Sequence, residues 1–215
     1  MEAFPASGVS YYRIIVALDI ERSTSRADPV KAALRAMLYE LFDAALRSAG
    51  ILRRHRDPFV DRGDSILALI HPVDSAPKAV LLNGVIPSFS RLLTDYNGAS
   101  QPQRQLRVRV VMHAGEVQYD ANGCFGEALD IAFRLLDAAQ VKKALQATAE
   151  PLALVISGDI YRTVVRHLDD ATGQDAFRPA VRVQVAGTHY PGWIHGAPAA
   201  ERHHLAEVAS YRQPA

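Results

Sequence analysis

The apolar residues of this chain follow two patterns. Residues 11–19 are an almost continuous apolar run rich in β-branched residues, which is typical of a short strand buried on both faces. Residues 29–49 instead repeat apolar residues every three or four positions, which is typical of a helix with one buried face. These criteria predict strands at 11–19, 66–70, 106–119, 151–157 and 179–185, and helices at 29–49, 77–96, 127–148 and 158–168.

Turn residues indicate how these elements connect. Residues 57–71 are expected to form a hairpin around the turn DRGD, with residues 66–70 as its returning strand. Pro87 falls inside the helix predicted at 77–96, so we expect a kink or break there. The element order is β-α-β-β-α-β-α-β-α-β, which favours an α+β sheet with the helices mostly on one face.

Length and charge bound the organisation of the chain. Its 215 residues suffice for one substantial domain. We expect that domain at 11–186, between an N-terminal extension at 1–10 and a tail at 187–215 that is rich in Pro, Gly and His and is expected to be only partly ordered. The formal net charge is +1, which does not supply the basic surface of a nucleic-acid binder, so no nucleic acid is expected as a partner.

Cysteine content and hydropathy indicate the compartment. Cys124 is the single cysteine, so no internal disulfide can form, and this fits a reducing cytoplasm. No apolar run approaches the roughly 18 residues that a membrane span needs. The N-terminus lacks the basic and apolar regions of a signal peptide. The sequence therefore predicts a soluble, cytoplasmic protein without a membrane span.

Two carboxylates stand at positions that a sheet could bring together. Asp19 ends the apolar run 11–19, and Asp64 lies at the tip of the predicted hairpin. Mg²⁺ and Mn²⁺ bind one or two carboxylates together with substrate phosphates, and a pair of such ions can clamp the attacking and leaving oxygens of a phosphoryl displacement. A buried carboxylate also needs a compensating charge. We interpret the pair as a candidate metal site, although either residue alone could be a simple turn or strand-end residue.

Together with residues 111–139, these stretches resemble the catalytic domain of class III nucleotidyl cyclases, the adenylate and guanylate cyclase family. The motifs that carry the resemblance are LDIERST around Asp19, RGDS around Gly63 and Asp64, and MHAGEV…GCFGEALDIAFRL, a predicted strand, turn and helix. The resemblance covers about residues 11–165. It implies the ferredoxin-like fold of that family, with a mixed, mostly antiparallel sheet and helices packed on it.

The resemblance implies a role for each matching residue. Asp19 and Asp64 would bind two divalent cations, Mn²⁺ or Mg²⁺, with the carbonyl of Ile20 as a further ligand. Arg134 would neutralise the charge that grows on the α-phosphoryl oxygens while a nucleoside triphosphate becomes a 3′,5′-cyclic nucleotide and pyrophosphate. The family forms its sites between two subunits, so a head-to-tail homodimer is implied, with the metals on one chain and the arginine on the other. Residues expected beside the substrate are Glu21, Arg22, Ser23 and Thr24 along the phosphates, next to a helix N-terminus, and Gly63 in the hairpin.

Three positions depart from the family pattern. Asp130 stands where the family has an asparagine, and a carboxylate beside a triphosphate needs compensation. The two positions that read the purine correspond to Val60 and Gly123, which offer no side-chain hydrogen bond, and Cys124 beside them could touch substrate or only fill the turn. With these departures, the chain is similar to the pyrimidine cyclases of bacterial Pycsar antiphage systems. Those enzymes make cyclic UMP or cyclic CMP to activate a separate effector. We adopt that interpretation of the substrate.

Other interpretations remain open. The chain could be a catalytically degenerate cyclase-like module that binds a nucleotide or a protein, or an adenylate cyclase with an atypical base pocket. Asp130 and Arg134 lie four residues apart on one predicted helix and could form an ordinary ion pair. The basic run at 53–56 is expected to be a solvated face unless it approaches phosphate, and His113 is expected to be structural.

Overall fold

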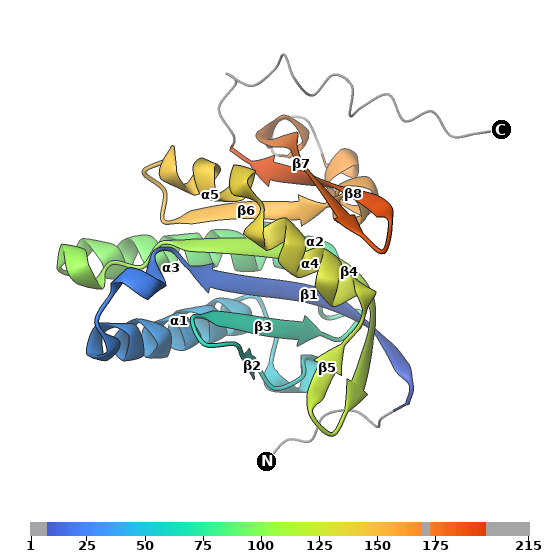
Figure 1. The fold of residues 1–215 in the computed structure, drawn as a ribbon, viewed down its shortest axis with the longest axis horizontal. Coiled ribbons are helices and arrows are strands. Elements are labelled where there is room, and N and C mark those ends of the chain that lie inside the picture. The colour runs from blue at the N-terminus through green and yellow to red at the C-terminus, as the bar shows by residue number, and fades with distance from the viewer. Residues whose placement is uncertain (1–7, 169–172, 197–215) are drawn as a thin grey trace.

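A computed structural model describes residues 8–168 and 173–196, which form one mixed sheet with helices packed on it (Figure 1). The strand order is β2-β3-β1-β4-β6-β8-β7, and the short β5 pairs with β4. Strands β4 and β6 run parallel, whereas the other paired strands are antiparallel, which confirms the expected mostly antiparallel sheet. The strands are β1 (Ser10–Ile20), β2 (Val60–Asp61), β3 (Ser65–Ile70), β4 (Val108–Asp120), β5 (Gly123–Phe125), β6 (Leu152–Ser157), β7 (Phe177–Val185) and β8 (Thr188–His195).

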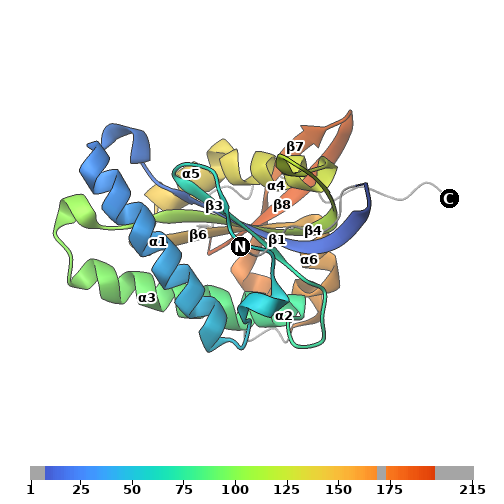
Figure 2. The same cartoon turned by 90° about the horizontal axis from the view of Figure 1, so that it is seen from below.

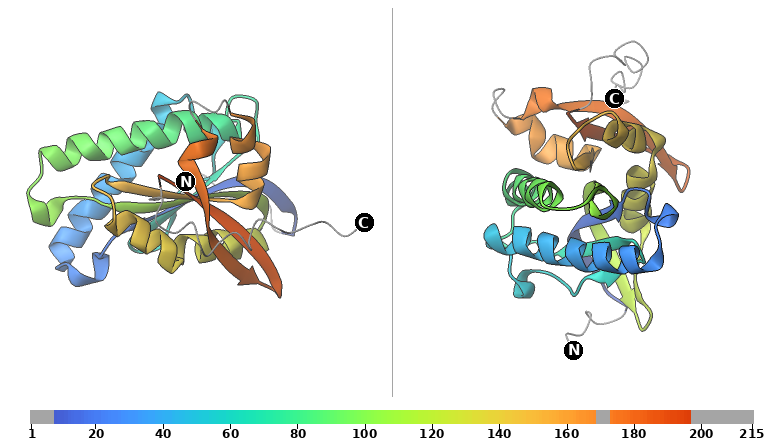
Figure 3. Two further views of the ribbon diagram at one scale, coloured as in Figure 1. Left: turned by 90° about the horizontal axis from the view of Figure 1, so that it is seen from above. Right: turned by 90° about the vertical axis from the view of Figure 1, so that its left-hand side faces the viewer.

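Most of the helices pack on one face of the sheet, as predicted, and two helices cover the other face. The helices are α1 (Asp28–Ser48), α2 (Lys78–Val80), α3 (Ile86–Gly98), α4 (Glu127–Asp137), α5 (Ala139–Gln146) and α6 (Gly158–Thr163). Seen from below, α1 and α3 lie on one side of the strands and α4 and α5 on the other, and two further views agree (Figures 2 and 3). The reason is visible in β1, where Val16 packs with the α1 and α3 side and Ala17 with the α4 side. A strand that is apolar on both faces needs cover on both.

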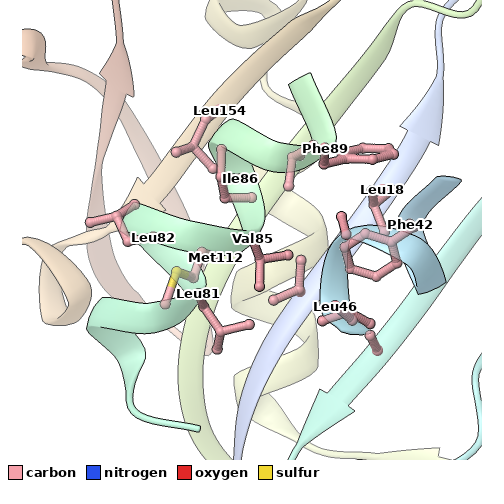
Figure 4. Packing of buried hydrophobic residues seen from close by; sticks show 14 of the residues in the cluster. Leu18, Phe42, Leu46, Leu81, Leu82, Val85, Ile86, Phe89, Met112 and Leu154 are labelled. Atoms are coloured by element: carbon pink, nitrogen blue, oxygen red, sulfur yellow. The ribbon is translucent and has the colours of Figure 1, made fainter. Parts of the chain in front are cut away.

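The larger core lies between the sheet and helices α1 and α3 (Figure 4). Phe42 from α1 and Phe89 from α3 meet edge to face with ring centroids 5.4 Å apart. Leu18 of β1 is fully buried in the same cluster. This packing fixes the end of β1, where Asp19 follows Leu18.

Two predicted helices are interrupted. The helix expected at 77–96 consists of α2, a π-helical turn at Leu81–Val85, and α3, with Pro87 in the first turn of α3. The missing N–H of Pro87 is tolerated in a first turn. The helix expected at 127–148 breaks at Ala138, whose ψ of 138° is extended, and becomes α4 and α5.

The C-terminal part of the described chain is more regular than expected. Residues 188–195, assigned from sequence to a partly ordered tail, form β8, which pairs with β7 and with the end of β6. An expected domain boundary after residue 186 therefore cuts a hairpin of the sheet. In the described ranges, no helix combines the length and apolarity needed to cross a bilayer.

Candidate active site

The candidate site begins with a row of three polar residues across neighbouring strands. Asp19 of β1 lies opposite Ser65 of β3 and opposite Arg109 of β4. Side chains alternate along a strand, so Asp19 faces the same side as Ala17, which is the side covered by α4. Only 8% of Asp19 is exposed, so its charge needs partners within the protein.

The two predicted carboxylates lie on either side of one hydroxyl group. Ser65 Oγ donates a hydrogen bond to Asp19 Oδ1 at 2.9 Å and lies 3.5 Å from Asp64 Oδ1. The backbone adds a second link, because the Ile20 N–H donates to the Asp64 carbonyl at 3.2 Å. The structure thus brings Asp19, Ile20 and Asp64 together where β1 ends and β3 begins.

Arg109 supplies the positive charge next to Asp19. Its Nη2 donates to Asp19 Oδ2 in a close ion pair. Its Nη1 donates to the Leu136 carbonyl at 3.4 Å, at the C-terminal end of α4, and lies 3.6 Å from Asp137. Burial lowers the pKa of Arg109, while Asp137 opposes that shift. The arginine thus joins the acidic tip of β1 to the end of α4.

Asp19 and Asp64 are carboxylates, the kind of ligand that a hard divalent cation prefers. Both oxygens of Asp19 already have partners in the protein, because Oδ1 accepts from Ser65 and Oδ2 pairs with Arg109. Across the described ranges, no cluster of three or more His, Cys, Asp or Glu side chains is arranged to hold a metal. One or two carboxylates completed by substrate phosphates is the usual arrangement for Mg²⁺.

The loop after Asp19 is held by Arg107, the residue just before β4. The Glu21 N–H donates to the Arg107 carbonyl at 2.8 Å, and Arg107 Nε donates back to the Glu21 carboxylate at 3.1 Å. Arg22 has a left-handed backbone with φ of 55°, and its carbonyl accepts a bond from Ser25 Oγ at 2.9 Å. Ser23 is buried in this turn. Thr24 is exposed.

Arg134 and Asp130 lie apart from the carboxylates. Both are on α4 and exposed, while the helix buries its other face on the sheet. Although both residues lie in the described part of the chain, no ion pair joins them, so the simple helix pair considered from sequence is absent. A single chain therefore does not bring Arg134 to Asp19.

The residues expected near the base pack against apolar side chains, with Arg62, Asp57 and Asp120 acting on the Cys124 thiol. Val60 of β2 and Cys124 of β5 are half-buried and pack against the cluster on the α4 side. Burial raises the pKa of the Cys124 thiol, which keeps it neutral at physiological pH. Gly63 has φ of +80° in the hairpin turn, and its N–H donates to Asp61 Oδ1 at 2.8 Å. Gly123, with φ of +136°, begins β5, which sequence analysis missed.

His113 and Arg56, the last residue of the basic run at 53–56, have structural partners. His113 is buried, its Nδ1 lies 2.8 Å from Ser157 Oγ, and burial lowers its pKa to about 4, so the ring is neutral at pH 7. In the basic run at 53–56, Arg56 is buried, pairs with Asp43 at 2.8 Å and stacks on Phe59. The first two arginines of the run are exposed.

Ser65, Arg107 and Arg109 are contributors that were not identified from the sequence. Their contacts with Asp19 and Glu21 depend on the register of β1 with β3 and β4, which is a tertiary property.

The fold is similar to solved cyclase domains. An adenylate/guanylate cyclase/hydrolase from Silicibacter pomeroyi matches with a TM-score of 0.61 at 16% identity, over 89% of this chain and 99% of that one. The guanylyl cyclase domain of the RhoGC fusion protein from the fungus Blastocladiella emersonii also matches. Its dimeric form has a TM-score of 0.59 at 15% identity, over 89% of this chain and 100% of that one. Its monomeric form has a TM-score of 0.56 at 14% identity, over 90% of this chain and 100% of that one. No protein-family model and no curated protein sequence matches the chain. At these identities the likeness shows a shared fold.

Proposed function

We propose that this chain is a class III nucleotidyl cyclase that converts a nucleoside triphosphate into a 3′,5′-cyclic nucleotide and pyrophosphate. The observation that carries the proposal is the pair Asp19 and Asp64, placed on either side of the Ser65 hydroxyl on a cyclase-like sheet. The resemblance of the surrounding motifs assigns the metal-binding role to these same two residues. Two Mn²⁺ or Mg²⁺ ions, when bound, supply charge neutralisation at the reacting phosphoryl group.

The chain's own residues would hold the reactants. Asp19 and Asp64 would offer anionic oxygens and the Ile20 carbonyl a neutral one, while the Ser65 hydroxyl donates to Asp19 and lies beside Asp64. The loop of Glu21, Arg22, Ser23 and Thr24 follows directly and would lie along the triphosphate. Arg109 balances Asp19 within the protein, and its planar guanidinium also suits phosphate oxygens.

A second copy of the chain would complete the site. Arg134 is exposed on α4 and has no contact with Asp19 in its own chain. In a head-to-tail homodimer, α4 of one subunit would present Arg134 to the carboxylates of the other, where it would stabilise charge on the α-phosphoryl group. Asp130 on the same exposed face would lower the positive potential there.

We further propose a pyrimidine substrate, UTP or CTP. Val60 has an apolar side chain and Gly123 has none, so neither of these two positions can read the polar edge of a purine. A cyclic UMP or cyclic CMP product would act in the cytoplasm as a messenger for a separate effector in antiphage defence.

One observation favours a second candidate, a cyclase-like module without turnover. Arg109 forms a direct ion pair with Asp19, and an arginine in that position competes with a metal for the carboxylate. Asp130 beside Arg134 favours the same alternative. An adenylate cyclase with an atypical base pocket is the third reading, and the assay below separates all three.

The test is to incubate the protein with each of the four nucleoside triphosphates and Mn²⁺ and to identify products by mass spectrometry. We expect cyclic UMP or cyclic CMP, and at least a hundredfold loss with Asp19→Asn. Asp95→Asn, which changes an exposed carboxylate of α3, should leave the rate unchanged. Cyclic AMP as the main product would favour the third reading. Absence of every cyclic product would favour the module.

A further inference from the structure

Arg62, in the hairpin that carries Asp64, extends the polar row of the candidate active site. Its N–H donates to the Ser65 carbonyl at 3.0 Å across the turn, and Ser65 lies opposite Asp19 on β1. Residues directly opposite one another in antiparallel strands have side chains on the same face of the sheet. Arg62 therefore shares the face of Ser65 and Asp19, which is the face that α4 covers.

The two residues before Arg62 agree with this direction. Val60 packs against the apolar cluster on the α4 side. Asp61 forms an ion pair with Arg35 of α1, which covers the opposite face. Side chains alternate along a strand, so Arg62 faces the same side as Val60. The hairpin thus presents Arg62 next to a position expected near the base of the substrate.

The guanidinium of Arg62 is held by an aromatic ring. It lies over Phe133 of α4, with 4.4 Å between its central carbon and the ring centroid. Such a stack orients the planar group and leaves its N–H donors free for other partners. The charge of Arg62 also lowers the pKa of the Cys124 thiol, against the effect of burial, so Arg62 lies near Cys124 as well. Phe133 directly precedes Arg134, so one helix carries this stack and the arginine expected at the α-phosphoryl group.

Arg62 has no anionic partner among the residues that the structure describes. The carboxylate of Asp61, just before it, is occupied by Arg35, and Asp64 lies beside the Ser65 hydroxyl. The side chain is also exposed. A positive group that is oriented but unpaired is available to a ligand that carries hydrogen-bond acceptors.

We propose that Arg62 reads the base of the substrate and selects cytosine, so that CTP is the preferred nucleotide. The inference rests on the proposed cyclase function and decides between its two pyrimidine substrates. A guanidinium is a planar fork of donors with no acceptor, and it binds best to two adjacent acceptors through parallel hydrogen bonds. Cytosine presents the acceptors N3 and O2 side by side. Uracil instead has an N3–H donor between its two carbonyls, so it can accept only one hydrogen bond from the fork at either carbonyl.

The purines divide in the same way. Adenine places its N6 amino group beside both N1 and N7, so a fork of donors would meet another donor. Guanine offers O6 and N7 together, which is the pair that arginine reads in DNA. Val60 and Gly123 supply no group for the remaining polar edge of guanine. The test therefore includes GTP beside the two pyrimidine nucleotides.

The test measures kcat/KM for CTP, UTP and GTP with Mn²⁺ in the wild type and in Arg62→Gln. We expect the wild type to prefer CTP, and Arg62→Gln to lower the ratio of CTP to UTP about tenfold, the discrimination of one bidentate pair. Arg54→Gln, which changes an exposed arginine outside the polar row, should keep the wild-type ratio. Phe133→Leu, which removes the stack, should lower the ratio less. A contact of Arg62 with phosphate would slow both nucleotides equally and leave the ratio unchanged.

A binding measurement separates failure of this inference from failure of the proposed function. Equilibrium dialysis with CTP or UTP in the presence of Ca²⁺ needs no turnover. Arg62→Gln should bind CTP more weakly than Arg54→Gln does, with UTP binding unchanged, and circular dichroism checks that both variants fold. That result without any cyclic product would support base reading by Arg62 and count against the cyclase. A ratio that Arg62→Gln leaves unchanged, a preference of the wild type for UTP or GTP, or absence of CTP binding to the wild type would overturn the inference.

Discussion

At the scale of single residues, Asp19 is a buried carboxylate whose hydrogen-bond donors come from the two strands beside β1. Ser65 holds one oxygen and Arg109 the other. A carboxylate with 8% exposure would otherwise be a large cost to folding. Because Arg109 already pairs with one oxygen of Asp19, a metal ion bound there would have to compete with the guanidinium.

Arg109→Gln tests how much the buried charge of Asp19 depends on Arg109 for compensation. Removing the guanidinium leaves the Asp19 charge buried and uncompensated, which should lower the free energy of unfolding by about 3 kcal/mol. Urea denaturation followed by the fluorescence of Trp193, the single tryptophan, which stacks on Tyr161 at 4.5 Å, measures the loss. If Asp19 is a metal ligand, Mn²⁺ should stabilise Arg109→Gln more than it stabilises the wild type.

The matched control is Arg91→Gln, which removes an exposed ion pair with Asp95 on α3. It should change stability little, since exposed pairs contribute little. A loss in Arg109→Gln no larger than in Arg91→Gln would contradict the role of Arg109. Absence of extra stabilisation by Mn²⁺ would count against the metal assignment of Asp19.

At the scale of elements, helix α4 is held at both ends by residues outside it. Tyr190 of β8 donates a hydrogen bond to the Glu127 carboxylate at the first turn. Arg109 of β4 bonds to the Leu136 carbonyl in the last turn. Between these ends the helix lies very close to β4. The position of Arg134 on the exposed face depends on all three contacts.

Gly115→Ala should displace this helix. A Cβ at residue 115 would lie 2.7 Å from the Ala128 Cβ, a contact that neither backbone can relieve by rotating a side chain. We expect a loss of about 1–3 kcal/mol in the free energy of unfolding, measured by urea denaturation, from overpacking at the β4–α4 contact. Cyclase activity, if present, should fall with it because Arg134 moves.

The compensating variant is Gly115→Ala combined with Ala128→Gly. Removing the opposing methyl group restores the space, so Gly115→Ala should be less destabilising in the Ala128→Gly background than in the wild type. Ala128→Gly alone sets the baseline, because glycine inside a helix is itself unfavourable. Equal losses in the two backgrounds would show that the close contact is not the cause.

At the scale of the whole molecule, the residues of the proposed site occupy two separate places. Asp19 and Asp64 lie together near the end of β1 and the start of β3, and Arg134 is exposed on α4. Under the proposed function, two copies arranged head to tail would pair each half with its complement. Such an arrangement predicts that defects in different halves complement one another.

Mixing Asp19→Asn chains with Arg134→Ala chains tests this arrangement. Random exchange makes half of the dimers mixed, and each mixed dimer has one intact site, so about a quarter of wild-type cyclic nucleotide formation should return. Mixing Asp19→Asn with Asp64→Asn should restore nothing, because both changes fall in the same half. If the first mixture also stays inactive while the wild type turns over, the shared site is wrong.

The sequence by itself determined most of the elements and the identity of the acidic pair. The apolar run of β1, the hairpin carrying Asp64 and the helix carrying Arg134 are local patterns, because strand and helix periodicity are written in neighbouring residues. Pro87 likewise marked the interruption between α2 and α3. The motifs in their order also indicated the cyclase-like fold.

Only the tertiary structure decided how these elements pair and pack against one another. Sheet register placed Arg109 on Asp19 and Ser65 between the two carboxylates. Residues 188–195 gained their strand by pairing with β6 and β7, although their composition suggested a loose tail. Helices cover both faces because both faces of the central strands are apolar. Pairing and register depend on residues far apart in the chain, so no local pattern could specify them.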